Sequence, residues 1–153
     1  MVAELRKTNK NLYETDYNLW VLQTATKLKN KDLDDLDWKN LIEEVEDLSR
    51  RDRQKLASLL TRLFEHFLKL AYWESEKARN QNHWQGEITN FRIQIKRVLK
   101  DSPSLRPHLE DILRDCYQDG RKIMARRSGL RLEMFPENPI ANLEQILDED
   151  WLP

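Results

Sequence analysis

The stretch LASLLTRLFEHFLKLA, residues 56–71, decides the fold class. Leucine and phenylalanine recur in it every three or four residues over roughly four helical turns, with few polar side chains between them. An apolar stripe this wide covers most of the surface of a helix. We therefore expect a helix here that lies at the centre of the fold.

The segments on either side carry narrower apolar stripes, also at helical spacing. They predict helices over residues 15–28, 38–48, 84–98 and 105–128. The first helix is expected to start at Thr15 or Asp16, and capping residues predict helix starts or restarts at Ser49, Asn82 and Ser102. The polar stretch 73–81 is expected to be a connection between helices.

The end of the chain has a different character. Gly129 is a candidate C-cap, and two prolines make residues 130–139 extended. Asn142 and Gln145 are placed to cap a short last helix that reaches about Glu149. We expect an all-α protein, an antiparallel bundle of four to five principal helices with an extended C-terminal arm, residues 130–153. The whole chain, 1–153, is expected to be a single helical domain with a flexible N-terminus, residues 1–12.

The composition supports this fold class. Charged residues make up 35% of the chain, but they nearly cancel to a net charge of −1. Leu, Ile, Val and Phe together reach about 26%, above the roughly 20% below which disorder is expected. A transmembrane protein and a disulfide scaffold are excluded, because no apolar window reaches 18 residues and Cys116 is the only cysteine. A β-sandwich is excluded because Leu outnumbers Val six to one and Gly and Pro are few. With no apolar signal core near Met1, we expect a cytoplasmic protein that does not bind membranes.

Short motifs punctuate the chain from Tyr13 onward. They are Tyr13-Glu14-x-Asp16-Tyr17-x-x-Trp20, LDWKNLIEEV at 36–45, HFLK at 66–69, Trp84-x-x-x-Ile88, Arg92, SPSL at 102–105, Phe135-Pro136, LEQIL at 143–147 and WLP at 151–153. This ordered set resembles the bacterial, mainly cyanobacterial, family called domain of unknown function twenty-nine, over nearly the whole chain. The resemblance implies an all-helical fold and no established catalytic mechanism, cofactor or partner. Gly120 stands where a small helix-forming residue is expected, which leaves helix continuity near it open.

Three histidines, His66, His83 and His108, are candidate metal ligands, since each falls on a different expected helix and some bundles converge three histidines on one divalent ion. A metal-dependent hydrolase or nuclease would follow from such a site. The other interpretation places His66 in a hydrogen-bonded, buried position and the other two in solvent near helix starts. No histidine pair has metal-ligand spacing, so the prediction is that the protein has no metal and no other cofactor.

Charge is distributed in blocks along the chain. Residues 31–47 hold eight acids against two bases, and residues 77–100 hold six bases against one acid. A second basic segment, 121–131, carries Arg121, Lys122, Arg126, Arg127 and Arg131. These segments could contact phosphates of a nucleic acid, or pair internally with the acidic segments.

The C-terminal arm ends in apolar anchors, Trp151 among them, which could seal the protein's own bundle or dock into a partner. The sequence contains no glycine-rich phosphate loop and no serine elbow, and Cys116 lies in an apolar stripe. We therefore expect a non-enzymatic protein-interaction or regulatory module, with a protein partner or self-association. The second basic segment and Trp151 are its candidate interaction residues. The alternatives are a nucleic-acid-binding module using segments 77–100 and 121–131, and the metal-dependent hydrolase.

Overall fold

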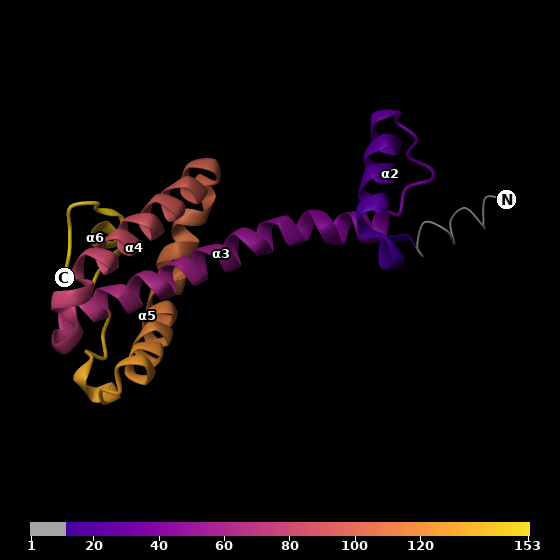
Figure 1. The fold of residues 1–153 in the computed structure, drawn as a ribbon. Coiled ribbons are helices and arrows are strands. Elements are labelled where there is room, and N and C mark those ends of the chain that lie inside the picture. The colour runs from indigo at the N-terminus through magenta and orange to yellow at the C-terminus, as the bar shows by residue number, and fades with distance from the viewer. Residues whose placement is uncertain (1–11) are drawn as a thin grey trace. The chain divides into compact units, whose positions relative to one another are not determined.

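The computed structural model describes residues 12–153, and every regular element in this part of the chain is helical. The elements are α2 (Tyr17–Lys29), α3 (Trp38–Tyr72), α4 (Glu74–Asp101), η1 (Pro103–Leu105), α5 (Arg106–Ser128), η2 (Leu132–Met134) and α6 (Leu143–Leu147) (Figure 1). The all-α prediction is confirmed. The flexible N-terminus expected over residues 1–12 lies outside the described residues, except for Leu12, which begins a helical turn.

The chain divides into two compact units, with the boundary after Arg50. The N-terminal unit contains residues 12–50 of the described chain, and the C-terminal unit contains residues 51–153. Helix α3 contributes to both. The single-domain assignment stays a prediction.

The core of the C-terminal unit is built around the second half of α3. Leu60, Phe64 and Phe67 are completely buried there, as the apolar pattern of residues 56–71 predicts. Helices α4 and α5 cover this half of α3 with fully buried side chains of their own, such as Ile88 and Tyr117. The rings of Phe64 and Tyr117 meet edge to face at 5.2 Å, so the contact between α3 and α5 is aromatic at its centre.

Gly120 lies in the middle of α5, which runs through it without a break. A Cβ atom at this position would lie 3.0 Å from the carbonyl oxygen of Thr61 and 3.3 Å from the backbone nitrogen of Glu65. The two helix backbones therefore approach more closely here than a larger side chain would allow. The glycine serves helix packing, and the question of helix continuity that the sequence left open is answered.

Two predicted helix boundaries are wrong. Helix α3 passes through Ser49 without a restart, and α4 begins at Glu74, where the sequence suggested a connection that ends at a cap on Asn82. The stretch 73–81 contains neither glycine nor proline, and Glu74 and Glu76 favour a helix N-terminus by their charge. Trp73 alone separates the two helices, and its ring stacks on Trp84 at 5.8 Å.

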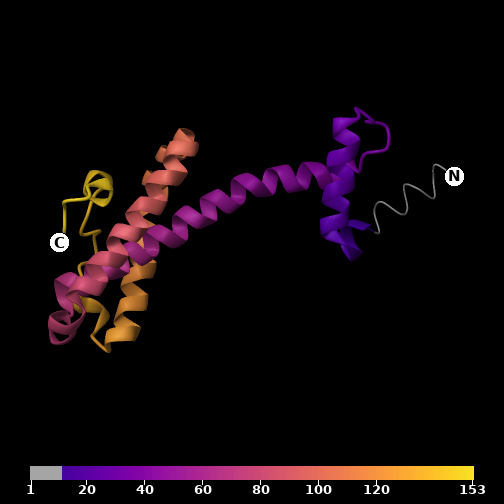
Figure 2. The same ribbon diagram turned by 45° about the horizontal axis from the view of Figure 1, so that its top comes forward.

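The C-terminal arm starts as predicted. Gly129 adopts a left-handed conformation, with φ of 71°, and ends α5. Asn142 and Gln145 form a reciprocal capping box at the start of α6, which ends at Leu147, two residues before the predicted limit. The arm packs on α5 near η2 and on α4 through α6 (Figure 1 and Figure 2).

Candidate interaction surface

The first half of α3 exposes its apolar side. Trp38, Ile42, Val45 and Leu48, here called the α3 stripe, recur on one side of the helix and are 50, 52, 59 and 60% exposed. Ordinary surface helices turn such a stripe toward a core. The α3 stripe is thus an apolar surface for which the N-terminal unit supplies no cover.

Helix α2 shows the same property. Leu19, Leu22 and Leu28 are all at least 40% exposed, whereas Trp20 and Leu36 are the buried large apolar side chains in the described part of this unit. A unit of roughly 40 residues rarely forms an adequate core by itself. The N-terminal unit therefore keeps much of its apolar area available for contact.

A cluster of aromatic residues packs on α3 beside the stripe. The hydroxyls of Tyr13 and Tyr17 each donate a hydrogen bond of 2.6 Å to the carboxylate of Glu44. The bond to Glu44 raises the pKa of Tyr13 to about 12, so its hydroxyl stays protonated as a donor. Glu44 lies about 40° around the helix from Leu48 and about 100° from Val45. The tyrosines therefore border the stripe on its Leu48 side and leave its four side chains at least half exposed.

Glu44 links α3 to α2 and to the helical turn before it. The structure gives it two tyrosine partners in the same unit. The ring of Tyr13 also meets Trp20 edge to face at 4.8 Å, which ties the start of the unit to α2. Of the two helix starts that the sequence left open, the structure uses Asp16, which caps α2 by accepting a hydrogen bond from the backbone of Leu19.

The three candidate histidines are not assembled into a metal site. His66 is buried, and its Nδ1 lies 2.8 Å from the carbonyl oxygen of Arg62, whereas His83 is exposed and His108 half-buried. Within residues 12–153, no group of three or more His, Cys, Asp or Glu side chains could hold a metal ion. The described residues give the metal-dependent hydrolase no site.

The second basic segment is partly used inside the fold. Arg121 donates to the carbonyl oxygen of Phe135 at 3.1 Å, and Arg127 forms a 2.8 Å ion pair with Glu65. Lys122, Arg126 and Arg131 are exposed. Three of the five basic side chains that the sequence pattern assigned to a partner are therefore available on the surface.

Trp151, the remaining candidate interaction residue, is half-buried against the protein's own core. Its ring meets Phe67 edge to face at 5.3 Å, and its carbonyl oxygen accepts a 2.8 Å hydrogen bond from Arg92. Arg92 also donates to the carbonyls of Ile146 and Gln145, at 2.8 and 3.0 Å. The C-terminal arm thus packs on its own bundle, which is one of the two arrangements that the sequence left open.

Arg92 is the structural residue that sequence analysis missed. It is 2% exposed and its guanidinium lies 5.2 Å from the centroid of Phe67, a cation–π distance. Burial lowers the pKa of its guanidinium, which stays charged because arginine starts so high. The available indication was its place directly after Phe91 in an apolar seam, but the surrounding basic residues suggested a solvated side chain.

Glu65 is a second buried charged residue that sequence analysis did not predict. Glu65 is 3% exposed and pairs with Lys69 at 3.4 Å as well as with Arg127. Its place inside the widest apolar stripe of the sequence was an indication that it is buried. The pair with Lys69 lies within α3, and the pair with Arg127 joins α3 to α5. Both are structural, because removing the partners would leave the buried charge of Glu65 uncompensated.

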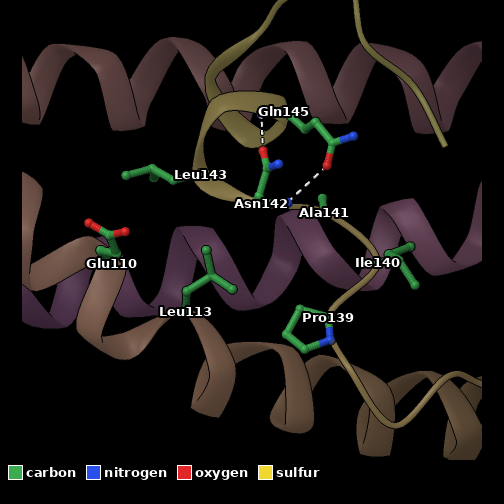
Figure 3. Close-up of a pocket in the computed structure, with 8 residues that line it drawn as sticks. All are labelled: Glu110, Leu113, Pro139, Ile140, Ala141, Asn142, Leu143 and Gln145. Carbon is green, nitrogen blue, oxygen red and sulfur yellow. Dashed lines mark hydrogen bonds between the residues drawn. The ribbon is translucent and has the colours of Figure 1, made fainter.

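A groove lies between α5 and the arm. Glu110 and Leu113 contribute from α5, and the arm lines the rest from Pro139 to Gln145 (Figure 3). Glu110 is the charged side chain among these lining residues. The side-chain oxygens of Asn142 and Gln145 each accept a hydrogen bond from the other residue's backbone N–H in the capping box, so these two acceptors are already used within the arm.

These features define a class: an all-α protein whose most distinctive surface is an uncovered apolar helix face, with no metal-binding cluster among residues 12–153. A model of the family described as "Domain of unknown function DUF29" matches residues 12–152. The chain belongs to this family. No curated protein and no solved structure matches the chain.

Proposed function

We propose that the protein is a non-enzymatic module that binds a protein through its N-terminal unit. One observation carries the proposal, the exposure of the α3 stripe on a helix that is well formed along its whole length. Contiguous exposed apolar surface is uncommon on soluble proteins and marks interaction sites. The C-terminal unit, which has a complete core of its own, would act as the stable scaffold for this surface.

The surface differs from the one that sequence analysis favoured. Trp151 and two of the arginines in the second basic segment have partners inside the C-terminal unit. The side chains of the α3 stripe are 50–60% exposed, so the N-terminal unit does not bury them. The proposal therefore moves the interaction site from the arm to α3.

A photo-crosslinking residue at position 45 tests the proposal in cells of the source organism. Val45 belongs to the stripe, and Ile93 on α4, 40% exposed, provides a matched control position. The expected result is a covalent adduct with a protein, either another protein or a second copy, from position 45 and not from position 93. Equal adducts at both positions, or none at 45, would contradict the proposal.

Nucleic-acid binding is the alternative. The exposed Lys122, Arg126 and Arg131 favour it, whereas the burial of Arg92 removes one charge from the segment 77–100. Binding through phosphate contacts would appear as salt-dependent retention on heparin. The Lys122→Glu and Arg126→Glu variants should abolish that retention if this segment is responsible, and the absence of retention at low salt rules the alternative out.

We also propose a cytoplasmic location. Cys116 is a buried free thiol, and burial raises its pKa, which keeps it in the unreactive protonated form. A single cysteine forms no internal disulfide and so suits a reducing compartment. The helices within residues 12–153 lack the combination of length and apolar character that crossing a bilayer requires.

A further inference from the structure

The α3 stripe has the dimensions of a helix-docking site. From Trp38 to Leu48 it extends about 15 Å along the axis, at 1.5 Å per residue. Four large side chains at spacings of four, three and three residues present a continuous ridge on one side. An amphipathic helix of a partner packs its own apolar side against such a ridge.

The charge around the stripe restricts the partner. Residues 12–50 contain ten carboxylates and five basic side chains, and residues 37–50 contain five carboxylates and two basic ones. Glu43 and Glu46 are exposed on α3. Arg50 pairs with Glu46 and Asp47 at 3.2 and 2.8 Å, which leaves the excess negative charge only partly neutralised. A partner with Lys or Arg beside its apolar side would be electrostatically complementary.

A second copy of the chain fits less well. A symmetric pairing of two stripes would bring two acidic units together. The C-terminal unit does not offer an apolar complement either, since Ile93, Met134 and Leu152 are its exposed large apolar side chains. The acidic surroundings also disfavour an anionic membrane surface.

We propose, on the basis of the proposed function, that the α3 stripe docks a basic amphipathic helix of another protein. The partner helix presents an apolar side about three turns long, bordered by lysine or arginine. The carboxylates near the stripe steer and orient it, and the apolar contact supplies the affinity.

Two synthetic helices test the chemistry on the full chain. Both are amphipathic peptides of roughly 18 residues with leucine on one side; the polar side is lysine in one and glutamate in the other. Fluorescence anisotropy should give micromolar binding of the Leu–Lys peptide, with the Leu–Glu peptide at least about tenfold weaker. Equal affinities for the two peptides, or no binding of the Leu–Lys peptide, would overturn the proposal.

Variants separate docking from simple charge attraction. The double substitution Ile42→Asp and Val45→Asp removes apolar contact and makes the unit more acidic. Docking on the stripe predicts a loss of Leu–Lys affinity of at least about tenfold, whereas non-specific attraction predicts a gain. Ile93→Asp is the matched control and should leave the affinity unchanged. An unchanged or raised affinity in the double variant would refute docking at the stripe.

Sedimentation of the full chain decides between partners. A monomer at tens of micromolar agrees with the proposal. A dimer that the Ile42→Asp, Val45→Asp variant dissociates would overturn it, because the occupant would then be a second copy. A dimer of this kind, or a crosslink from position 45 to a second copy of the chain, would still agree with the proposed function. The absence of any crosslink at position 45 would contradict the proposed function, independently of the peptide result.

Discussion

The two units share helix α3, but its apolar side is exposed in the N-terminal unit and buried in the C-terminal unit. Leu48 and Leu60 both lie on α3 at apolar positions of its helical pattern, yet Leu48 is 60% exposed and Leu60 is completely buried. The difference comes from what packs on each half of the helix, not from the helix itself. Apolar periodicity therefore predicts that a segment is helical and which side is apolar, but not whether the same chain covers that side.

The largest effect should follow from a cavity in the buried half of α3. Leu60→Ala removes a completely buried side chain, and such changes cost about 2–5 kcal/mol of unfolding free energy. Urea unfolding followed by circular dichroism measures the change. Ser58→Ala, at an exposed position on the same turn, is the control. A loss below about 1 kcal/mol would mean that the C-terminal unit lacks the tight core described above.

The arm provides the next test, because a single side chain binds it to the unit. Arg92→Leu leaves the carbonyls of Gln145, Ile146 and Trp151 without their donor, at a cost of about 2–4 kcal/mol. Hydrogen exchange over residues 141–152 should accelerate at the same time. Arg97→Leu, an exposed neighbour on α4, is the matched control. An unchanged exchange rate in Arg92→Leu would show that apolar contacts alone hold the arm.

Much of the fold could be predicted from the sequence. The central position of residues 56–71, the left-handed Gly129 and the capping box of Asn142 follow from local rules, and the structure confirms each. Local rules failed at Ser49, a capping residue inside α3, and before Asn82, where a connection was expected but α4 already begins at Glu74. A cap is a permitted start of a helix, and tertiary packing decides whether it is used.

The site was harder to predict than the fold. Three arginines that look alike in the sequence have different surroundings in the structure. Arg92 is buried under the arm, Arg121 donates to a carbonyl of the arm, and Arg127 pairs with Glu65. Charge in a sequence does not reveal its partner when that partner lies many residues away. The α3 stripe was recognised as apolar, but an amphipathic pattern implies a core, and the exposure appears only once the neighbours are placed.

A smaller, pH-dependent effect should mark the C-terminal unit. Burial, and then the charge of Lys69, lower the pKa of His66, so the native protein disfavours its protonation. The unfolded chain takes up this proton near pH 6.5, so stability present above that pH is lost as the pH falls below it. Urea midpoints measured between pH 5 and 8 should show this loss (a range set by the ordinary histidine pKa of about 6.5). His66→Gln should reduce the pH dependence of the urea midpoint, whereas the control His83→Gln, at an exposed position, should leave it unchanged. If both variants keep the pH dependence of the unmodified protein, other groups cause the loss of stability.

The smallest effect on stability should come from Leu48→Ala, which makes the same chemical change as Leu60→Ala on the same helix. Because Leu48 is 60% exposed, its truncation removes little buried area, and the unfolding free energy should change by less than about 0.5 kcal/mol. The crosslinking yield from position 45 and the Leu–Lys peptide affinity should nevertheless fall in this variant. A residue whose loss leaves the fold intact but weakens binding is kept apolar for contact with a partner. If Leu48→Ala instead destabilises the protein as much as Leu60→Ala does, the stripe is covered by the chain itself, and the contrast between the two halves of α3 disappears.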